Sequence, residues 1–384
     1  MTTYTFEAEA LTPVHIGAGQ EIDPCEFVLK DGSLMRFNPA QVFNDLDEAA
    51  RKTFEALSEK ADLKALQGFF REYAIPERYA LAWVDASREF VNQFEKNVED
   101  PNNSFLVQMM PRNPQTGHVC LPGSSLKGAI RTAVVNHFTN LVPSLKGTVH
   151  VAVKQAHPKD RGKVLEQKAL DRTVTRNDGR ERDEIDRDVF RLIDVEDTVL
   201  PSGLTMISRA INWNPHKAGS EQIQMWFERV KSRADGETQR FQVKLHVDDN
   251  AMNHPAMRRK LGRTIDLKTI VDASNSFYWG RLAAELDKFF QGNTDPTRQA
   301  VYRTMAVQDS KGRHIVQEPV YPQMLIRVGR FSHFESLSVD ELREGWNAQR
   351  NRPIDGMGAT RTLCHMGDGK PSLPFGWVLL TLSS

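Results

Sequence analysis

The 384-residue sequence is poor in the features that mark secreted, metal-binding and membrane proteins. Its only cysteines, Cys25, Cys120 and Cys364, lie far apart and form no C-x-x-C pair, so neither a disulfide framework nor a structural zinc site is indicated. No apolar run approaches the roughly 18 residues of a membrane span, and the N-terminus lacks the basic and apolar parts of a signal peptide. We therefore expect a cytoplasmic protein with no membrane contact, no metal and no cofactor.

The sequence also lacks net charge. Lys plus Arg and Asp plus Glu are both 50, and this total, taken alone, argues against a nucleic-acid-binding protein. With 40% apolar and 26% charged residues, the composition is that of an ordinary globular protein. The length corresponds to two or three domain-sized units, or to one core with large insertions.

The charges are, however, unevenly distributed along the chain. Residues 1–100 hold 19 acidic and 10 basic residues, whereas residues 101–159 contain no Asp or Glu at all. The stretch 101–176 carries a net charge of plus eight. Such segregation favours a polyanion on one surface and a protein partner on another, although a solvated loop of mixed charge equally explains residues 154–191.

Hydrophobic periodicity and turn signals predict an α+β fold. The predicted strands are 4–10, 26–30, 34–37, 104–110, 190–195, 204–209, 242–247, 323–328 and 377–382. The predicted helices are 38–57, 62–73, 87–98, 125–140 and much of 255–292. Asp31-Gly32 is typical of a tight hairpin turn, and 154–188 is highly charged, poorly periodic and expected to protrude. Because strands and helices do not alternate regularly, we predict a sheet with helical insertions.

The most informative motif is the segment from Leu121 to Arg131. Pro and Gly form a turn, Ser124 or Ser125 is expected to cap a helix, and Lys127 and Arg131 share one helix face. Free N–H groups at the helix start, hydroxyls and two cations together predict a phosphate-binding element. The alternative is a capped surface helix with two solvated bases.

Two glycine-rich segments would let the backbone approach a ligand closely. The first contains His15, Gly17 and Gly19, and the second contains Gly356, Gly358 and Arg361. Each is equally compatible with an ordinary turn or loop.

Catalytic signatures are scarce. The Walker A, nucleophile-elbow and HExxH patterns are all unmatched, and His246-Val247-Asp248-Asp249 favours a turn over a metal site. His15 could act as a general base, but a single histidine beside a strand is more often structural. Asp23, just beyond the first glycines, is the one carboxylate that we single out as a candidate catalytic group.

Taken in order, these motifs resemble the RAMP superfamily, the RRM-like subunits of CRISPR effector complexes. The segment Leu11–Gly19 resembles the family's N-terminal strand and glycine turn, and Leu121–Arg131 resembles its internal motif. The length, the helical insertions and the late Arg327-Val328-Gly329 are most similar to the subunit that caps the 3′ end of the guide RNA in type III-A Csm complexes.

The resemblance implies a Cas7-like, RRM/ferredoxin-like antiparallel core with helical insertions and a basic thumb. The core would comprise residues 1–38, 104–150, 189–250 and 323–384, the insertions 39–103 and 251–322, and the thumb 151–188. The thumb cations expected to bind RNA are Lys154, Lys159, Arg161, Lys163, Arg172 and Arg176. The stacking aromatics of an RRM are absent, so binding would be directed at phosphates.

The implied function is that of a non-catalytic RNA-binding subunit of a ribonucleoprotein in antiviral defence. Its implied partners are the guide RNA (crRNA), the target RNA, the backbone RAMP subunit, the small helical subunit and the large polymerase-like subunit. In the related backbone subunit an Asp after the glycine loop cleaves target RNA, so an RNA-cleaving role for Asp23 is one alternative. A protein scaffold within the same complex is the other.

Overall fold

A computed structural model describes residues 1–60, 62–98, 100, 105–216, 225–236, 240–308, 314–347, 351–354, 356–367 and 369–383. The molecule contains two main sheets with helices packed around them, so the α+β prediction is confirmed. Within the described residues, no helix is long and apolar enough to cross a bilayer.

The first sheet is antiparallel throughout and is built around the N-terminal strand. Its order is β10 (Ile193–Val195), β14 (Arg240–Val247), β1 (Thr2–Ala10), β22 (Trp377–Leu382) and β17 (Gln323–Arg327). Helices α6 (Gly123–Asn136) and α11 (Leu267–Phe289) pack against it, α6 at β10 and α11 at β17. Phe6 of β1 and Trp377 of β22 are fully buried in the resulting core.

The first sheet also presents polar side chains to solvent. Glu7 of β1 forms an ion pair with Arg240 of β14 at 2.6 Å, and Lys244 pairs with Glu196 at 3.3 Å. Among the aromatic side chains of its strands, Tyr4 is half-buried and three are buried, namely Phe6, Phe241 and Trp377. Base stacking on this sheet is therefore not supported.

The second sheet joins segments that are far apart in the sequence. Its order is β2 (Glu21–Ile22), β6 (Val107–Gln108), β13 (Met225–Val230), β12 (Thr205–Trp213), β5 (Ala82–Ala86), β4 (Ser33–Arg36) and β3 (Phe27–Lys30). In addition, β20 (Arg361–Cys364) pairs with β12, and β21 (Leu373–Pro374) pairs with β20. The Asp31-Gly32 turn between β3 and β4 is confirmed, with φ angles of 51° and 75°.

Shorter elements complete the molecule. The helices are α1 (Pro39–Asn44), α2 (Glu48–Glu59), α3 (Leu63–Tyr73), α4 (Pro76–Tyr79), α5 (Arg88–Asn97), α7 (Pro143–Gln155), α8 (Arg161–Ala169), α9 (Asp249–Asn253), α10 (Pro255–Lys260) and α12 (Pro296–Met305). The strands are β7 (Cys120–Leu121), β8 (Thr173–Thr175), β9 (Glu181–Asp183), β11 (Thr198–Val199), β15 (Val307–Gln308), β16 (His314–Ile315), β18 (Gly345–Asn347) and β19 (Arg352–Ile354). Single turns of 3₁₀ or π helix are η1 (His137–Leu141), η2 (Pro158–Asp160), η3 (Ile185–Arg187), η4 (Val189–Leu192), η5 (Arg233–Asp235) and η6 (Phe334–Ser336).

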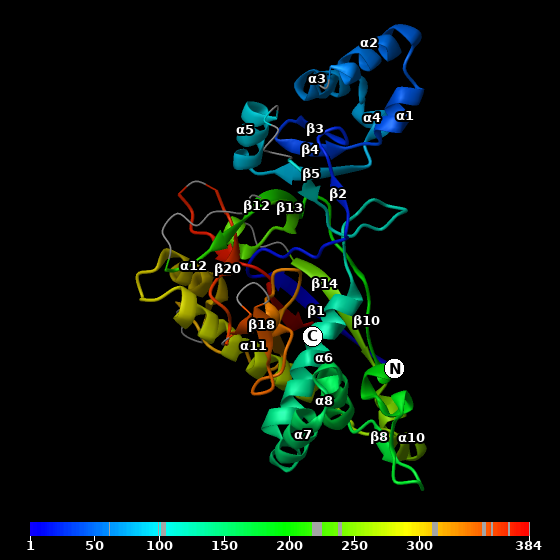
Figure 1. Cartoon of the computed structure of the whole chain (residues 1–384), viewed down its shortest axis with the longest axis vertical. Helices are drawn as coiled ribbons and strands as arrows, with labels where there is room; N and C mark the ends of the chain where they lie inside the picture. The colour runs from blue at the N-terminus through cyan, green and yellow to red at the C-terminus, as the bar shows by residue number, and fades with distance from the viewer. Residues whose placement is uncertain are drawn as a thin grey trace.

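The molecule is elongated, with α1 to α4 at one end and α7, α8, α10 and β8 at the other (Figure 1). The first sheet and α11 lie between these two ends. Helices α1 to α4 are thereby separated in space from the basic residues of α7, α8 and the β8–β9 hairpin.

Several predicted elements differ from the structure. The predicted helix 38–57 is two helices, because Asp47 caps a new start by accepting a hydrogen bond from the Ala50 N–H at 2.8 Å. The charged segment 154–188 is not irregular, since it contains α8 and a hairpin of β8 and β9. The predicted strand 190–195 is extended only from Ile193, after the turn η4.

The predicted strand 104–110 is reduced to β6, and Ser104 lies outside the described residues. β5 comes from the segment predicted as a helical insertion, yet it pairs in parallel with β12 through Met206 and Asp85. A short strand of this kind carries too few residues for its period to be recognised in a sequence.

At one edge of the first sheet, a side chain of α11 satisfies two backbone groups of β17. The amide of Asn275 on α11 donates to the carbonyl of Gln323 at 2.8 Å and accepts from the Leu325 N–H at 2.7 Å. Asn275 is 3% exposed, so both backbone groups of the edge strand are satisfied away from water.

Replacing this amide should destabilise the fold. We expect Asn275→Ala to lower the free energy of unfolding by about 2–4 kcal/mol, because a buried N–H and a buried carbonyl lose their partners. Urea denaturation followed by circular dichroism measures the loss. Asn97→Ala, which removes an exposed amide bonded only to Gln93, is the control. A loss no larger than that of the control would contradict the role assigned to Asn275.

Candidate nucleic-acid interface

The start of α6 lies directly against the backbone of a distant segment. A Cβ atom on Gly123 would overlap the carbonyl oxygen of Val195, so only glycine fits there. The Gly123 N–H donates to a carboxylate oxygen of Asp197 at 2.7 Å. The motif is therefore a docking site for residues 195–197 as well as a helix start.

The expected serine cap is not observed. Pro122 occupies the cap position and no side chain within the motif caps the helix, because Asp197 already satisfies the first N–H group. Ser124 is exposed, Ser125 is half-buried, and both hydroxyls remain next to the helix start.

The two cations of the motif have different environments. The Lys127 amine lies 3.7 Å from Asp194, and the exposed fractions of these side chains are 31% and 67%. A surface ion pair with this N···O distance contributes little to stability. The Lys127 amine therefore remains available to a phosphate.

Arg131, in contrast, belongs to a partly buried ion network. Its guanidinium contacts Glu166 of α8 at 2.6 Å and Asp188 at 2.8 Å, and it lies over the Phe190 ring at 4.9 Å. Although burial alone would lower it, the two carboxylates hold the pKa of Arg131 above its usual value. Arg131 thus fastens α6 to α8, and its charge is neutralised within the protein.

The predicted thumb cations divide into two groups. Arg161 pairs with Glu344, and Arg172 pairs with Asp183 at 2.6 Å and Asp188 at 3.2 Å. Within the described ranges, the other four are exposed and their side chains form neither ion pairs nor hydrogen bonds; these are Lys154, Lys159, Lys163 and Arg176.

The β8–β9 hairpin adds two cations that the sequence analysis missed. Arg180 and Arg182 are exposed, and Arg176 lies beside them because its N–H donates to the Arg180 carbonyl at 2.9 Å. Two neighbouring acids are paired with other cations, Glu181 with Lys168 and Asp183 with Arg172, whereas the exposed Asp178 at the turn accepts a hydrogen bond from the Arg180 backbone N–H at 2.9 Å. These ion pairs could not be predicted from the sequence, in which acidic and basic residues alternate from Arg180 to Asp183. The hairpin thus presents three exposed arginines together with the exposed carboxylate of Asp178.

The first glycine segment is built on a buried histidine. The Nδ1–H of His15 donates to the Glu228 carbonyl at 2.6 Å, and the ring packs beside Phe227 and Phe331. His15 is 1% exposed, and burial lowers its pKa to about 4. A ring buried to this extent cannot contact RNA directly. It holds in place the turn that contains the exposed Gly17 and Gly19.

Arg330 places a cation at this glycine turn, and the sequence analysis did not identify it. Its N–H donates to the His15 carbonyl at 2.9 Å, and Gly329 before it has φ of 99° and leaves no room for a Cβ against that carbonyl. The exposed Arg330 side chain donates to Gln108 and passes 3.9 Å from the position of a Cβ on Gly17. The sequence signal for this cation was the dipeptide Gly329-Arg330, a glycine followed by an arginine.

The second glycine segment does not present its arginine to solvent. Arg361 is fully buried, contacting Glu285 at 2.8 Å and Glu335 at 2.7 Å. Gly356 and Gly358 adopt positive φ angles of 57° and 75° in the preceding turn. The cradle predicted from these three residues is thus corrected, because its cation faces the core.

The catalytic candidates form no reactive constellation. Asp23 is exposed and accepts a hydrogen bond from the Cys25 N–H at 2.6 Å, which closes a local turn. His246 contacts Glu196 at 2.8 Å, and Asp248 caps α9. No cluster of three potential metal ligands occurs among the described residues.

Comparisons with known proteins point to one family. The model of the RAMP superfamily matches residues 7–300. The CRISPR system protein Csm5 of Methanocaldococcus jannaschii is 22% identical over 232 residues, which are 56% of this chain and 47% of that protein. The chain therefore spans about half the length of the curated relative that it matches.

Two solved structures share the fold. One is a chain of a cryo-EM structure of a Csm–crRNA–target RNA ternary complex from a type III-A CRISPR-Cas system, with a TM-score of 0.66, 17% identity and full coverage of both chains. The other is the crystal structure of T. onnurineus Csm5, with a TM-score of 0.58, 17% identity and coverage of 97% of this chain and 99% of that one.

Two glycines of α6 should respond oppositely to the same substitution. We expect Gly123→Ala to destabilise the protein by several kcal/mol, since the methyl group overlaps the Val195 carbonyl. Gly128→Ala meets no atom within 4 Å and should stabilise it by about 1 kcal/mol. Thermal denaturation of both variants measures the difference, and a tolerated Gly123→Ala would show that α6 is not docked in this way.

Stability should fall in mild acid because of His15. Its pKa is about 4 in the folded state and 6.5 normally, so only the unfolded state binds the proton between these values. The contribution of neutral His15 is complete above pH 6.5 and should decrease by up to about 3 kcal/mol as the pH falls to 4. Urea unfolding across this range should show a shallower pH dependence for His15→Phe than for wild type. The exposed His118→Gln should follow wild type, and equal slopes in all three proteins would refute the assignment.

Proposed function

The chain belongs to the RAMP superfamily, and on this premise we propose that it is an RNA-binding subunit of a type III-A CRISPR effector complex. In this proposal it holds the 3′ region of the guide RNA and caps the backbone filament. The similarity to Csm5 and to a chain of a Csm complex supports the assignment.

The observation that carries RNA binding is a set of exposed cations at one end of the molecule whose side chains form no ion pair within the described residues. Lys154, Lys159 and Lys163 lie on and between α7 and α8, and Arg176, Arg180 and Arg182 lie on the adjoining hairpin. Phosphate groups are the natural ligands of such a surface, because the backbone of RNA repeats a negative charge that these side chains can follow. Binding would be sensitive to salt and tolerant of guide sequence.

The opposite end of the molecule is suited to protein partners. Helices α1 to α4, residues 39–79, hold eight acidic and six basic residues and lie far from the hairpin (Figure 1). We assign this end to the other subunits of the complex, namely the backbone RAMP subunit, the small helical subunit and the large polymerase-like subunit. The basic end is assigned to guide and target RNA.

A binding role is favoured over an enzymatic one by the surroundings of Asp23. One oxygen of its exposed carboxylate accepts a hydrogen bond from the Cys25 N–H, and among the described residues no histidine or cation contacts the carboxylate. A nuclease needs such a group, or a metal ion, to activate the attacking hydroxyl.

The hairpin arginines provide the test. We expect Arg176→Gln, Arg180→Gln and Arg182→Gln together to weaken single-stranded RNA binding at least tenfold and to reduce the slope of log affinity against log salt by about 2. Fluorescence anisotropy over a salt series measures both. The control removes two exposed cations at the other end, Lys52→Gln and Lys64→Gln, and should leave affinity and slope unchanged.

Equal affinities for the hairpin variant and the control would rule out this surface as the RNA site. In the assembled complex, target RNA should be handled identically by wild type and Asp23→Ala. Cleavage that depends on Asp23 would instead establish the nuclease alternative.

A further inference from the structure

Helix α10 carries a group of cations that the proposed RNA surface does not include. Arg258, Arg259 and Lys260 end this helix, and all three side chains are exposed. Within the described residues, which include the whole stretch 240–308, these side chains form no ion pair and no hydrogen bond. We call these three residues the α10 cluster.

The chain around the α10 cluster is free of acidic residues. Residues 250–265 contain no Asp or Glu, and besides the cluster they include one further cation, Arg263. The nearest acids on either side have partners of their own: Asp248 with the N-terminal amine, Asp249 with the Tyr4 hydroxyl, and Asp266 with the Thr269 N–H. The cluster is therefore a local concentration of positive charge in a chain whose formal total is zero.

The chain that follows α10 is packed tightly against the segments that enter and leave the β8–β9 hairpin. A Cβ atom on Gly262 would lie 2.1 Å from the carbonyl oxygen of Asp171, so only glycine fits there. On the other segment, the Arg187 carbonyl accepts a hydrogen bond from the Gly262 N–H at 3.0 Å. The Arg263 side chain donates to the Ala169 carbonyl at 3.3 Å. These contacts hold α10 at a fixed position relative to the hairpin.

The acids at this junction are mostly paired. Asp171 pairs with Arg187 at 3.3 Å, and Asp186 pairs with Arg191. Glu184 is exposed and its side chain forms no ion pair in the described parts of the chain, so it opposes part of the positive charge. The three cations of the α10 cluster and the three hairpin arginines nevertheless outnumber Glu184 and the exposed Asp178.

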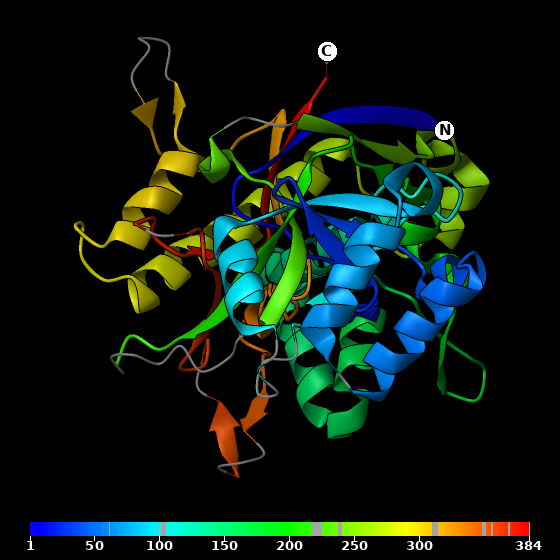
Figure 2. The same ribbon diagram turned by 90° about the horizontal axis from the view of Figure 1, so that it is seen from above.

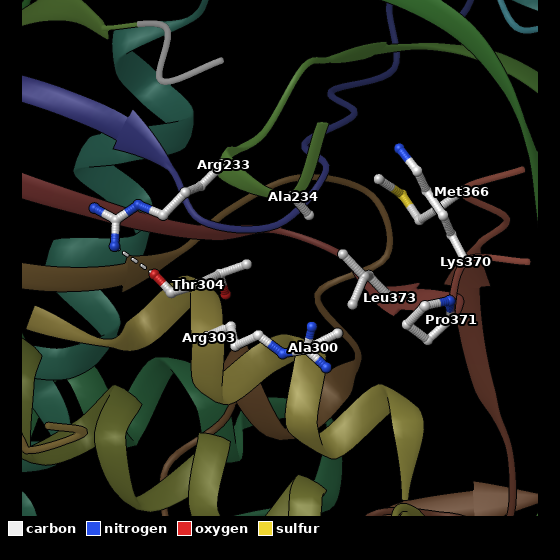
Figure 3. A pocket seen from close by; sticks show the side chains of 9 residues that line it. All are labelled: Arg233, Ala234, Ala300, Arg303, Thr304, Met366, Lys370, Pro371 and Leu373. Atoms are coloured by element: carbon white, nitrogen blue, oxygen red, sulfur yellow. Dashed lines mark hydrogen bonds between the residues drawn. The ribbon is translucent and has the colours of Figure 1, made fainter. Parts of the chain in front are cut away.

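The α10 cluster and the hairpin lie on the same flank of the molecule. In two views at right angles, both are found on the flank opposite α12 (Figures 1 and 2). The cations beside the cavity between η5 and α12 do not gather in this way. There the Lys370 amine points away from Arg303, and Arg233 donates to the Thr304 carbonyl at 2.6 Å (Figure 3). The α10 cluster is thus the better placed to extend the RNA surface.

We propose that the α10 cluster binds the phosphate backbone of single-stranded RNA and extends the RNA surface of the hairpin. Residues 248–265 contain no Phe, Tyr or Trp, so these contacts would be to phosphates and independent of base sequence. Because the docking of Gly262 fixes the two groups of cations relative to each other, a strand that is long enough contacts both, and its second contact is intramolecular. The inference rests on the proposed function, because it requires RNA at the hairpin.

The experiment compares three variants of the full chain. The α10 variant, Arg258→Gln, Arg259→Gln and Lys260→Gln, removes the cluster, whereas Arg258→Lys with Arg259→Lys keeps its charge. The matched control removes two exposed arginines and one exposed lysine from α2 and α3 at the other end of the molecule: Arg51→Gln, Lys64→Gln and Arg71→Gln. All of these side chains are exposed, so each variant should fold, which circular dichroism checks.

Fluorescence anisotropy with RNAs of about 5 and about 20 nucleotides measures what the cluster contributes. The α10 variant should bind the long RNA at least tenfold more weakly than the control does, and the short RNA equally, since a short strand is held at the hairpin alone. For the long RNA, the slope of log affinity against log salt should fall by about 2, which is the loss of three phosphate contacts at about 0.7 each. The variant that keeps the charge should bind both RNAs as the control does.

Photoreactive long RNA should also cross-link wild type within residues 254–260, a measurement that needs no substitution. Equal affinity of the α10 variant and the control for the long RNA, or absence of this cross-link, would overturn the inference. The proposed function stands in that case if the hairpin variant described above still weakens binding. Failure of wild type to bind either RNA would reject the proposed function and the inference together.

Discussion

Two buried arginines and two buried glutamates join the two sheets of this protein. Arg327 of β17 and Arg361 of β20 both contact one carboxylate oxygen of Glu285, at 3.0 and 2.8 Å, and Arg361 also contacts Glu335. All four side chains are at most 1% exposed, so their charges are tolerable only because they balance. The first sheet, the second sheet and α11 meet at this cluster, and the glycine turn that ends at β20 is held by it.

Ion pairing with carboxylates also determines which cations of the protein can bind a ligand. Arg131 and Arg172 lie in the basic stretch but share the carboxylates of Glu166 and Asp188. Their ion pairs therefore stabilise the packing between elements of the protein. The hairpin shows the opposite case, where Glu181 and Asp183 are paired with Lys168 and Arg172, and the side chains of three arginines, Arg176, Arg180 and Arg182, form no ion pair within the described residues. A net charge of zero for the whole chain is therefore compatible with strongly basic surfaces, because the pairing of charges in space decides what solvent encounters.

Local signals were predictable from the sequence, and long-range pairing was not. The α+β class and the Asp31-Gly32 turn depend on neighbours within a few residues and were correctly predicted. The cap of α6 by Asp197 and the burial of Arg361 against Glu285 join residues more than seventy positions apart. No local pattern distinguishes such an arginine from one that faces solvent, so its role emerged only from the fold.

The position of β1 has a consequence for how the protein is made. This strand lies between β14 and β22, and the Thr12 hydroxyl that follows it bonds to the Trp377 N–H, 365 positions away. At roughly 5–20 residues per second, a ribosome would finish β22 on the order of 20 to 70 seconds after β1 emerges. During that interval one hydrogen-bonding edge of the central strand stays open, which makes the nascent chain a natural client for chaperones and leaves assembly to wait for the C-terminal strand.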